Sequence, residues 1–224
     1  MRLGQIKLLS REHLIKTGPV DYADWNYRAL IGTIQRLRFS LALSLLPPRS
    51  HRLLEVGFGS GVFMPSLHAI AEEVCGIDVH DEISRVKTTL GTQGMNAELV
   101  RSQVEAIPFA SGYFDSIVAI SSLEFVGDLS SACAEIRRVL KSNGSFVVVT
   151  PGKSPLVDAG LRVLTGNSAT KDFGDRRENI IPTLLRFFTV DECRAFPPIG
   201  HKMVCLYRAF RLTPVAPGQA KTLP

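Results

Sequence analysis

Three glycines, Gly57, Gly59 and Gly61, alternate with other residues in the stretch LLEVGFGSGVF, directly after an apolar run. A strand, a glycine turn and a following helix would place backbone N–H groups and the positive end of the helix beside a ligand. A P-loop is excluded, because no lysine follows Gly61. A dinucleotide fingerprint fits poorly but stays open, because Val62 stands where its third glycine belongs.

Two carboxylates accompany this loop. Glu55 stands two positions before Gly57, at the predicted end of the strand, where a carboxylate suits a cationic ligand such as S-adenosylmethionine (SAM) better than a pyrophosphate. Asp78 follows Gly57 by 21 residues, at the end of the next predicted strand, and could accept both hydroxyls of a ribose. That feature serves NAD and SAM alike. The simpler alternative is a merely tight loop with an N-capping Asp78.

The elements that must position these residues alternate regularly between His51 and Pro151. Strands are predicted at 51–56, 74–79, 97–103, 114–120 and 145–151, and helices at 62–73, 81–91 and 129–144. The second of these helices should end at Gly91, and the third should have Gly144 at its C-terminal turn. Strict alternation of strands and helices predicts an α/β fold with a parallel sheet covered by helices on both faces.

The flanking segments are predicted to be organised differently. Residues 21–48 read as an aromatic-rich turn followed by an amphipathic helix that two prolines end, which predicts an N-terminal helical lid over residues 1–50. Thr189 and Glu192 have capping-box spacing and predict the start of a helix. The remaining expectations are a helix at 154–165, a polar loop at 166–179, a strand at 203–212 and a flexible tail at 213–224.

The composition excludes several classes of protein. The longest apolar stretch, residues 39–46, is far shorter than the roughly 20 residues of a membrane span. The first residues do not resemble a signal peptide, so a cytoplasmic address is expected. The four cysteines and five histidines show no metal-binding spacing, and the cysteines are expected to be small buried residues. The middle of the chain is acidic and both flanks are basic, without a nucleic-acid-binding signature; contact with a membrane surface stays open.

Five segments in order resemble the class I SAM-dependent methyltransferases, particularly the small-molecule branch that includes the ubiquinone and menaquinone C-methyltransferases. They are LLEVGFGSG, VCGIDVH, QVEAIPFASGYFDSIV, SSLEFVGD and IRRVLKSNGSFVVVTP. The resemblance covers residues 51–152. It implies a Rossmann-like, doubly wound, mostly parallel sheet of the seven-stranded type, with an antiparallel hairpin after Arg186. The implied methyltransferase domain spans residues 51–212.

The resemblance implies a cofactor, SAM, whose product is S-adenosylhomocysteine, and places its methionine end. Gly57, Gly59 and Gly61 would line that end with backbone. Glu55 would fix the loop and, directly or through water, the ammonium group. Ser121, just past the fourth strand, would meet the amino-acid moiety.

The nucleoside end follows in the same way. Asp78 would bind the ribose hydroxyls and Val79 would pack on the adenine. Val104 would offer its backbone N–H to the ring. Gln103 stands where the family usually has an Asp that accepts from the adenine amino group, and its side-chain carbonyl can accept that bond too. Phe125 is a departure, because the family has a histidine there.

Methyl transfer from a sulfonium is an in-line displacement that needs a positioned nucleophile, so the resemblance implies no obligatory catalytic residue and we assign none. Glu124, His80, Tyr22 and Tyr27 could act near the acceptor, or be structural. Motifs for methylating nucleic-acid bases are absent after the fourth strand, which favours a small-molecule or lipid-like acceptor methylated on O, N or C.

The segments least similar to the family should contact that acceptor. Tyr22, Trp25 and Tyr27 with Arg28 suggest an aromatic wall, and Arg176 with Arg177 a guanidinium clamp for an acidic or amphiphilic molecule. A hydrophobic staple and an exposed loop explain them equally well. Two alternative functions stay open: an NAD(P)-dependent oxidoreductase and a SAM-binding module without turnover. The sequence assigns no oligomeric state.

Overall fold

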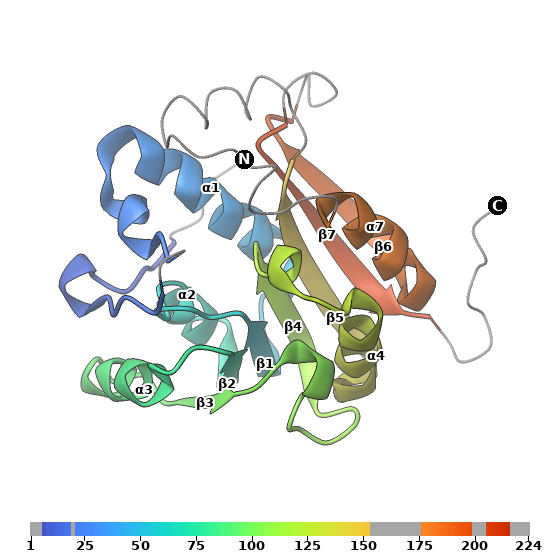
Figure 1. Ribbon diagram of the computed structural model, residues 1–224, viewed down its shortest axis with the longest axis horizontal. Coiled ribbons are helices and arrows are strands. Elements are labelled where there is room, and N and C mark those ends of the chain that lie inside the picture. The colour runs from blue at the N-terminus through green and yellow to red at the C-terminus, as the bar shows by residue number, and fades with distance from the viewer. Residues whose placement is uncertain (1–5, 19–20, 153–175, 199–204, 216–224) are drawn as a thin grey trace.

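The computed structural model describes residues 6–18, 21–152, 176–198 and 205–215. Its sheet has seven strands in the order β3-β2-β1-β4-β5-β7-β6, and the first five are parallel (Figure 1). The last strand in sequence, β7, lies antiparallel between β5 and β6. The strands are β1 Ser50–Val56, β2 Ala71–Asp78, β3 Ala97–Arg101, β4 Phe114–Ile120, β5 Leu140–Pro151, β6 Phe188–Phe196 and β7 Tyr207–Pro214.

Helices cover both faces of this sheet, as the sequence predicted. One face carries α1 Ala29–Leu45, α2 Met64–His68 and α3 Ile83–Thr92, and the other carries α4 Leu129–Val139 and α7 Arg176–Phe187. Short 3-10 turns lie at Arg11–His13 (η1), Ala23–Tyr27 (η2), Val104–Ala106 (η3) and Leu123–Phe125 (η4). Neighbouring strand residues such as Leu53 and Leu54 belong to opposite cores, because side chains alternate along a strand. The Rossmann-like α/β fold is thereby confirmed.

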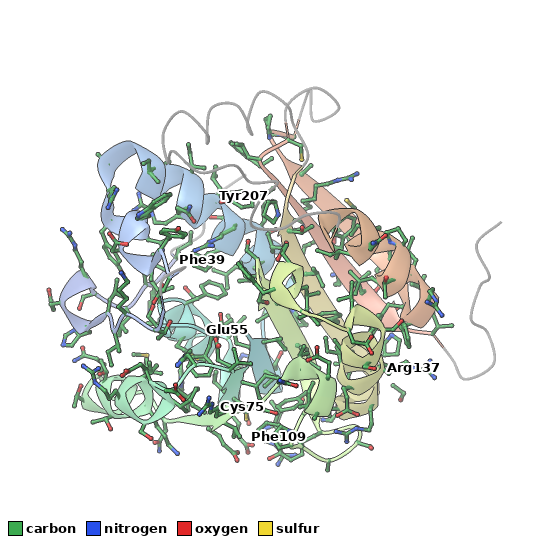
Figure 2. The ribbon with its side chains drawn as sticks, in the orientation of Figure 1. Phe39, Glu55, Cys75, Phe109, Arg137 and Tyr207 are labelled. Atoms are coloured by element: carbon green, nitrogen blue, oxygen red, sulfur yellow. The ribbon has the colours of Figure 1, made fainter. Side chains whose placement is uncertain are left out.

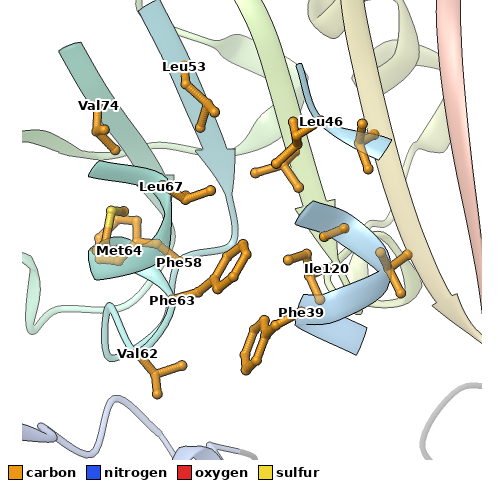
Figure 3. Packing of buried hydrophobic residues seen from close by; sticks show 14 of the residues in the cluster. Phe39, Leu46, Leu53, Phe58, Val62, Phe63, Met64, Leu67, Val74 and Ile120 are labelled. Carbon is orange, nitrogen blue, oxygen red and sulfur yellow. The ribbon is translucent and has the colours of Figure 1, made fainter. Parts of the chain in front are cut away.

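The long helix α1 packs against the sheet. Its Phe39, on the inner side of the helix, belongs to the same buried cluster as Tyr207 of β7 (Figure 2). Phe39 also stacks on Phe63 with ring centroids 4.6 Å apart, and both belong to the buried cluster that includes Leu53 of β1 and Leu67 of α2 (Figure 3). The described residues among the first 50 therefore share a core with the rest of the described chain, and their separation as a lid domain stays a prediction.

The segment before α1 is attached to the end of the glycine loop. The backbone N–H of Leu9 donates to the carbonyl of Val62 at 3.0 Å, and Lys7 and Ser66 exchange two hydrogen bonds between backbone and hydroxyl. Within the described part of the chain, no helix is both long enough and apolar enough to cross a membrane.

Two predicted helices are too long at their C-terminal ends. The helix expected at 62–73 ends at His68, and β2 already begins at Ala71. Within β2, Glu73 forms an ion pair with Arg52 of the neighbouring strand β1 at 2.7 Å. The helix expected to Gly144 ends at Val139, because residues from Leu140 onward pair in the sheet beside β4. Pairing with a neighbouring strand overrode local helical spacing in both places.

The predicted C-terminal end of α3 at Gly91 was also wrong. Gly91 lies inside that helix, which continues to Thr92, and Gly94 is the residue with a positive φ, at 72°, after its end. Pro65 lies in the first turn of α2, where its missing N–H has no intrahelical partner to lose.

The C-terminal region differs most from the prediction. The segment that begins at Thr189 is strand β6, and the helix lies before it, as α7, partly within the predicted polar loop. Glu192 pairs with Arg194 at 2.7 Å and with Arg211 of the neighbouring strand at 3.5 Å, so it does not cap a helix. The antiparallel hairpin expected after Arg186 is confirmed. The helix predicted at 154–165 lies outside the described residues, and positions 213 and 214 of the expected tail complete β7.

One charged side chain of α4 fixes the loop that follows η3. Arg138 donates to both carboxylate oxygens of Glu135, at 2.7 and 2.8 Å, and to the carbonyls of Ile107 and Phe109, each at 2.8 Å. Glu135 in turn accepts the backbone N–H of Ile107 at 2.9 Å. These bonds attach the loop to α4, because the carbonyls of Ile107 and Phe109 both accept from the guanidinium group.

We expect Arg138→Met to lower the free energy of unfolding by about 2 kcal/mol, because several charge-assisted hydrogen bonds are lost together. For a chain of this size that corresponds to a fall in melting temperature of about 4–8 °C. Arg137→Met is the matched control, since Arg137 lies on the outer side of α4 (Figure 2). Equal melting temperatures for the two variants would contradict the role given to Arg138.

Candidate cofactor and acceptor cavity

A cavity of about 970 Å³ opens at the carboxyl ends of β1, β2 and β4, where the strand order reverses. Ligands of open α/β sheets bind at such a reversal. Eight of the nine residues predicted to bind the cofactor line it: Glu55, Gly57, Gly59, Asp78, Val79, Gln103, Val104 and Ser121. Gly61 does not; a Cβ placed there would lie 3.2 Å from Val86 of α3, so the glycine lets the loop pack on that helix.

The glycine loop has the backbone conformation that its sequence predicts. Gly57, Gly59 and Gly61 have φ angles of 77°, 52° and 71°, which only glycine adopts without strain. The N–H of Gly57 still bonds to Ile77 of β2 at 2.9 Å, so the loop leaves the sheet at this residue. Ser122 holds the loop from the other side, since its hydroxyl donates to the carbonyl of Val56 at 2.8 Å.

Asp78 connects the end of β2 to this loop. Its two carboxylate oxygens accept the backbone N–H groups of Gly59 and Val79, each at 2.7 Å. His80 braces the same place, because its Nε2 lies 3.0 Å from the carbonyl of Gly59 while its Nδ1 accepts the N–H of Glu82 at 3.1 Å. That pairing requires the imidazole proton to be on Nε2. The carboxylate is thus fixed at the cavity wall and keeps lone pairs for further donors.

Glu55 is a buried acid in the same wall, with only 4% of its surface exposed. Burial, and then the nearby charge of Asp78, raise its pKa well above the ordinary value, while Arg38 opposes the shift. Its Oε2 has no hydrogen-bond partner among the described residues. A buried carboxylate oxygen without a donor is costly, so the site fits a ligand that brings a positively charged donor such as an ammonium group.

The raised pKa gives a pH-dependent prediction for Glu55→Gln. The unfolded chain releases the Glu55 proton at about pH 4.3, whereas the folded protein keeps it to higher pH. The free energy of unfolding of the native protein therefore falls as pH rises through that window, and the variant lacks this component. We expect the variant to have the higher melting temperature, by a margin that is smallest near pH 4 and grows as the pH rises above it.

The same substitution should weaken the binding of S-adenosylhomocysteine by roughly tenfold or more, because a charge-assisted hydrogen bond becomes a neutral one. Thermal melts across the pH series check the change in melting temperature, and calorimetry at neutral pH checks the loss of affinity. A variant that is less stable than the native protein at pH 7 would contradict the burial argument.

The far side of the cavity offers an apolar platform. Val79 is 59% exposed although it is apolar, and Val104 is a buried residue of η3; both line the cavity. Gln103 precedes η3 and is exposed at the cavity. The N–H of Ser102 bonds to the carbonyl of Asp78 at 2.9 Å, which keeps the ends of β3 and β2 together. Apolar side chains of this kind suit contact with a flat aromatic ring.

Ser121 marks the end of β4. It is the one non-glycine residue with a positive φ in the described part of the chain, at 52°, and its hydroxyl is buried without a partner there. Strained backbone of this kind persists where the surrounding structure enforces it, and it clusters at ligand sites. Its N–H bonds to Val149 of β5 at 2.8 Å, so the sheet fixes the position of this residue.

The roof of the cavity comes from the N-terminal segment, which sequence reasoning described only as a lid. Asp21 accepts the N–H and hydroxyl of Thr17, both at 3.0 Å, and the N–H of Ala23 at 2.9 Å, so this turn is closed by its own carboxylate. A Cβ placed on Gly59 would lie 3.9 Å from the Thr17 hydroxyl, which puts the turn directly over the glycine loop.

Only part of the predicted aromatic wall reaches the cavity. Tyr22, which is 41% exposed, lines it, whereas the Tyr27 hydroxyl bonds to the carbonyl of Leu9. Trp25 and Arg28 stack on each other, with the guanidinium carbon 5.4 Å from the ring centroid, and neither lines the cavity. The wall is instead completed by side chains that the sequence did not single out, Phe39, Tyr207 and Arg38, together with Phe125.

Some sequence expectations concern other parts of the chain. The side chains of Arg176 and Arg177 lie outside the described part, so the guanidinium clamp stays a prediction. Cys75, Cys133 and Cys205 are buried as expected, but Cys193 is exposed on the edge strand β6 and the expectation was wrong there. The described residues contain no cluster of three or more side chains suited to a metal ion.

Comparisons with known proteins agree with this geometry. A family described as "Methyltransferase domain" matches residues 54–148. The ubiquinone/menaquinone biosynthesis C-methyltransferase of Pasteurella multocida is 30% identical over 117 residues, 49% of this chain and 43% of the relative. The malonyl-[acyl-carrier protein] O-methyltransferase of Geobacter sulfurreducens is 30% identical over 149 residues, 64% of this chain and 52% of the relative.

The chain thus spans about half the length of these curated relatives. Among solved structures, the PH0226 protein of Pyrococcus horikoshii superposes with a TM-score of 0.62 over 87% of this chain and 95% of that one, at 17% identity, which is a similarity of fold. Residues 54–148 of this chain are therefore similar to the family described as a methyltransferase domain.

Proposed function

We propose that the protein transfers a methyl group from SAM to a small-molecule or lipid-like acceptor by in-line displacement. The observation that carries the proposal is that two carboxyl groups lie beside the glycine loop. Glu55 is buried with an unpartnered oxygen, and Asp78 is fixed by two backbone donors. The first suits the ammonium group of the methionine moiety and the second suits the ribose hydroxyls. A dinucleotide pyrophosphate carries no donor for the unpartnered oxygen of Glu55.

The cofactor supplies a methyl group already activated on a sulfonium sulfur. The residues of this chain then have to bind, orient and exclude water. Val79 and Val104 offer an apolar slot for the adenine, with Gln103 beside it as an acceptor for the amino group. The turn around Asp21 covers the glycine loop and shields the reacting end of the cavity from water.

The acceptor would lie on the other side of the cavity, where aromatic side chains predominate. Tyr22, Phe39, Phe125 and Tyr207 line this part, and Phe125 is 49% exposed. Such a surface favours a molecule with a planar or greasy body over a free amino acid or sugar. The names of the relatives, a quinone C-methyltransferase and an acyl-carrier-protein O-methyltransferase, support an acceptor of this class.

Binding assays test the proposal first. Calorimetry with SAM, S-adenosylhomocysteine and NAD should show binding of the first two and none of the third. Binding of NAD without SAM would overturn the proposal in favour of an oxidoreductase, which the valine in place of a third fingerprint glycine already disfavours.

Turnover is the second test. Incubation with SAM and a metabolite extract should release S-adenosylhomocysteine, and mass spectrometry should find one extract component heavier by a methylene unit. SAM binding without any release across extracts would favour a SAM-binding module that lacks turnover. The cytoplasmic address stays a prediction that fractionation of the native cells would test.

A further inference from the structure

His80 lines the cavity two residues after Asp78, and the proposed function does not use it. Its side chain is only 8% exposed. The backbone N–H of Glu82 donates to Nδ1 at 3.1 Å, and Nε2 lies 3.0 Å from the carbonyl oxygen of Gly59. Because a carbonyl oxygen only accepts, the imidazole is neutral with its proton on Nε2. Both nitrogens are thus engaged, so neither is available to take a proton from a methyl acceptor.

Gly59 is held on both sides by the end of β2 and the turn after it. Its N–H donates to Oδ2 of Asp78 at 2.7 Å, and its carbonyl accepts from His80. Its φ is 52°, in the middle of the glycine loop. Glycine loses more conformational freedom on ordering than any other residue, so its conformation here depends on the groups that fix it. Asp78 and His80 together supply that fixation.

Protonation of His80 would disturb this arrangement at two points. An imidazolium ion has donors on both nitrogens, so Nδ1 could no longer accept the N–H of Glu82, which precedes α3. The new charge on the ring would also attract Oδ2 of Asp78, which lies 4.0 Å from Nε2 and now accepts from Gly59. Histidine is the side chain whose charge ordinarily changes between about pH 5 and pH 8. The disturbance therefore falls in a range that experiments reach easily.

The groups around His80 leave Asp78 as its acidic neighbour. Among the described residues, no other carboxylate lies within 4.0 Å of the imidazole. The glycine loop presents the uncharged ring of Phe58, with the two ring centroids 5.3 Å apart. The other charged side chains that line this side of the cavity or flank His80 are Asp21, Arg38, Glu55, Asp81, Arg101, Glu82 and Arg85. The last four form two ion pairs with one another.

We propose that His80 is a positioning residue for the cofactor, which binds while the imidazole is neutral and is released when it is protonated. This inference rests on the proposed function. The neutral ring holds the carbonyl of Gly59 and leaves Asp78 available for the ribose hydroxyls. The protonated ring takes Asp78 as its counter-ion and loosens the loop. A proton on His80 and a bound cofactor then oppose each other.

The test measures the affinity for S-adenosylhomocysteine by calorimetry at pH 7.5 and pH 5.5. This probe has no sulfonium charge, so repulsion between that charge and an imidazolium ion does not enter. The proteins are the native chain, His80→Gln, His80→Ala and His51→Gln. Glutamine retains an amide donor for the carbonyl of Gly59 but does not titrate. His51→Gln is the control, because it removes an imidazole that is 49% exposed and lies outside the cavity.

Between pH 7.5 and pH 5.5, Kd of the native protein should rise by about tenfold more than Kd of His80→Gln. Both proteins contain Glu55 and Asp78, so the titration of those two groups is common to them. At pH 7.5, His80→Gln should bind within about threefold of the native protein, and His80→Ala should bind about fivefold more weakly or worse, because the carbonyl of Gly59 loses its donor. His51→Gln should follow the native protein at both pH values.

A second measurement needs no variant. Two-dimensional NMR of the imidazole nitrogens of His80 should show the proton on Nε2 at pH 7.5. Saturation with S-adenosylhomocysteine should lower the pH at which His80 is half protonated by about one unit or more, because linkage between a proton and a ligand is reciprocal.

Several results would overturn the inference. An equal rise of Kd in His80→Gln and in the native protein would assign the pH dependence to Glu55 or Asp78 instead. Native affinity of His80→Ala at pH 7.5 would show that the loop does not need the imidazole. If neither variant folds, a proton on Nδ1 or a titration that the ligand does not move would be decisive. A native protein that does not bind S-adenosylhomocysteine at pH 7.5 would refute the proposed function itself.

Discussion

The variant Asp78→Ala is expected to lose measurable binding of SAM and S-adenosylhomocysteine. The carboxylate would hold both ribose hydroxyls, and charged hydrogen bonds of this kind contribute about 1.5–3 kcal/mol each, so Kd should rise by roughly two to four orders of magnitude. The same carboxylate also orders the loop through Gly59 and Val79, so the substitution removes ligand contacts and loop geometry together. Titration calorimetry measures the first effect directly.

The control for this prediction is Asp81→Ala. Asp81 lies three residues further along, its side chain is 79% exposed, and it pairs with Arg101 on the surface. Removing it takes away the same charge near the same loop, yet the affinity for S-adenosylhomocysteine should stay within experimental error. An Asp78→Ala protein that binds as tightly as Asp81→Ala would refute the ribose role of Asp78.

Gly57→Ala is expected to have the largest effect on stability. The φ of 77° is strained for any residue with a side chain, at about 1–2 kcal/mol. The new Cβ would also lie 2.5 Å from the Cβ of Ser122, whose hydroxyl is bonded to Val56 and cannot turn away freely. Overpacking of this kind costs about 1–3 kcal/mol, so the total should be about 3 kcal/mol. Denaturant unfolding measures it.

Gly91→Ala provides a matched substitution with the opposite sign. Gly91 lies within α3, and an added Cβ would meet nothing within 4 Å. Alanine favours the helix over glycine, so we expect a gain of up to about 1 kcal/mol. If Gly57→Ala were tolerated as well as Gly91→Ala, the close contact with Ser122 would not constrain the loop as described.

The cofactor side of the cavity could be predicted from sequence because its signals are local. The glycine spacing requires a particular backbone conformation, and the three positive φ angles follow from it. Glu55 and Asp78 each stand at the end of a strand, and the ends of neighbouring parallel strands meet at one edge of a sheet. The positions of Glu55 and Asp78 in the sequence were therefore enough to predict that they lie close together in the structure.

The element boundaries that failed were decided by partners distant in sequence. Thr189 and Glu192 have the spacing of a helix cap, but pairing with β7 turns the segment into a strand, and Glu192 meets Arg211 across the strands. Leu140 follows a helical pattern, yet it pairs beside Phe114 in the sheet. Local propensity cannot anticipate a neighbour whose position depends on the whole topology.

The segment over the cavity was predicted as a lid, but the place of Arg38 in the cavity wall was missed for a related reason. Arg38 looks like one surface charge of an amphipathic helix, because nothing near it in sequence indicates that this turn of α1 faces the glycine loop. One signal was available: the charge adjoins a stretch, from Phe39 to Leu46, that has no other charged residue. A lone charge bordering an apolar helix face warrants a search for its counter-ion.

The packing of α1 has a consequence for how the chain is made. Its buried face contacts β7, and Phe39 shares a core with Tyr207, so the two partners lie near opposite ends of the sequence. During synthesis α1 emerges before β7. The part of its apolar face that contacts β7 therefore stays uncovered after the contacts with β4 and β5 can form, and a nascent chain stalled before Tyr207 would expose it to chaperones. The cavity wall is completed at the same late stage, because Tyr207 of β7 contributes to it.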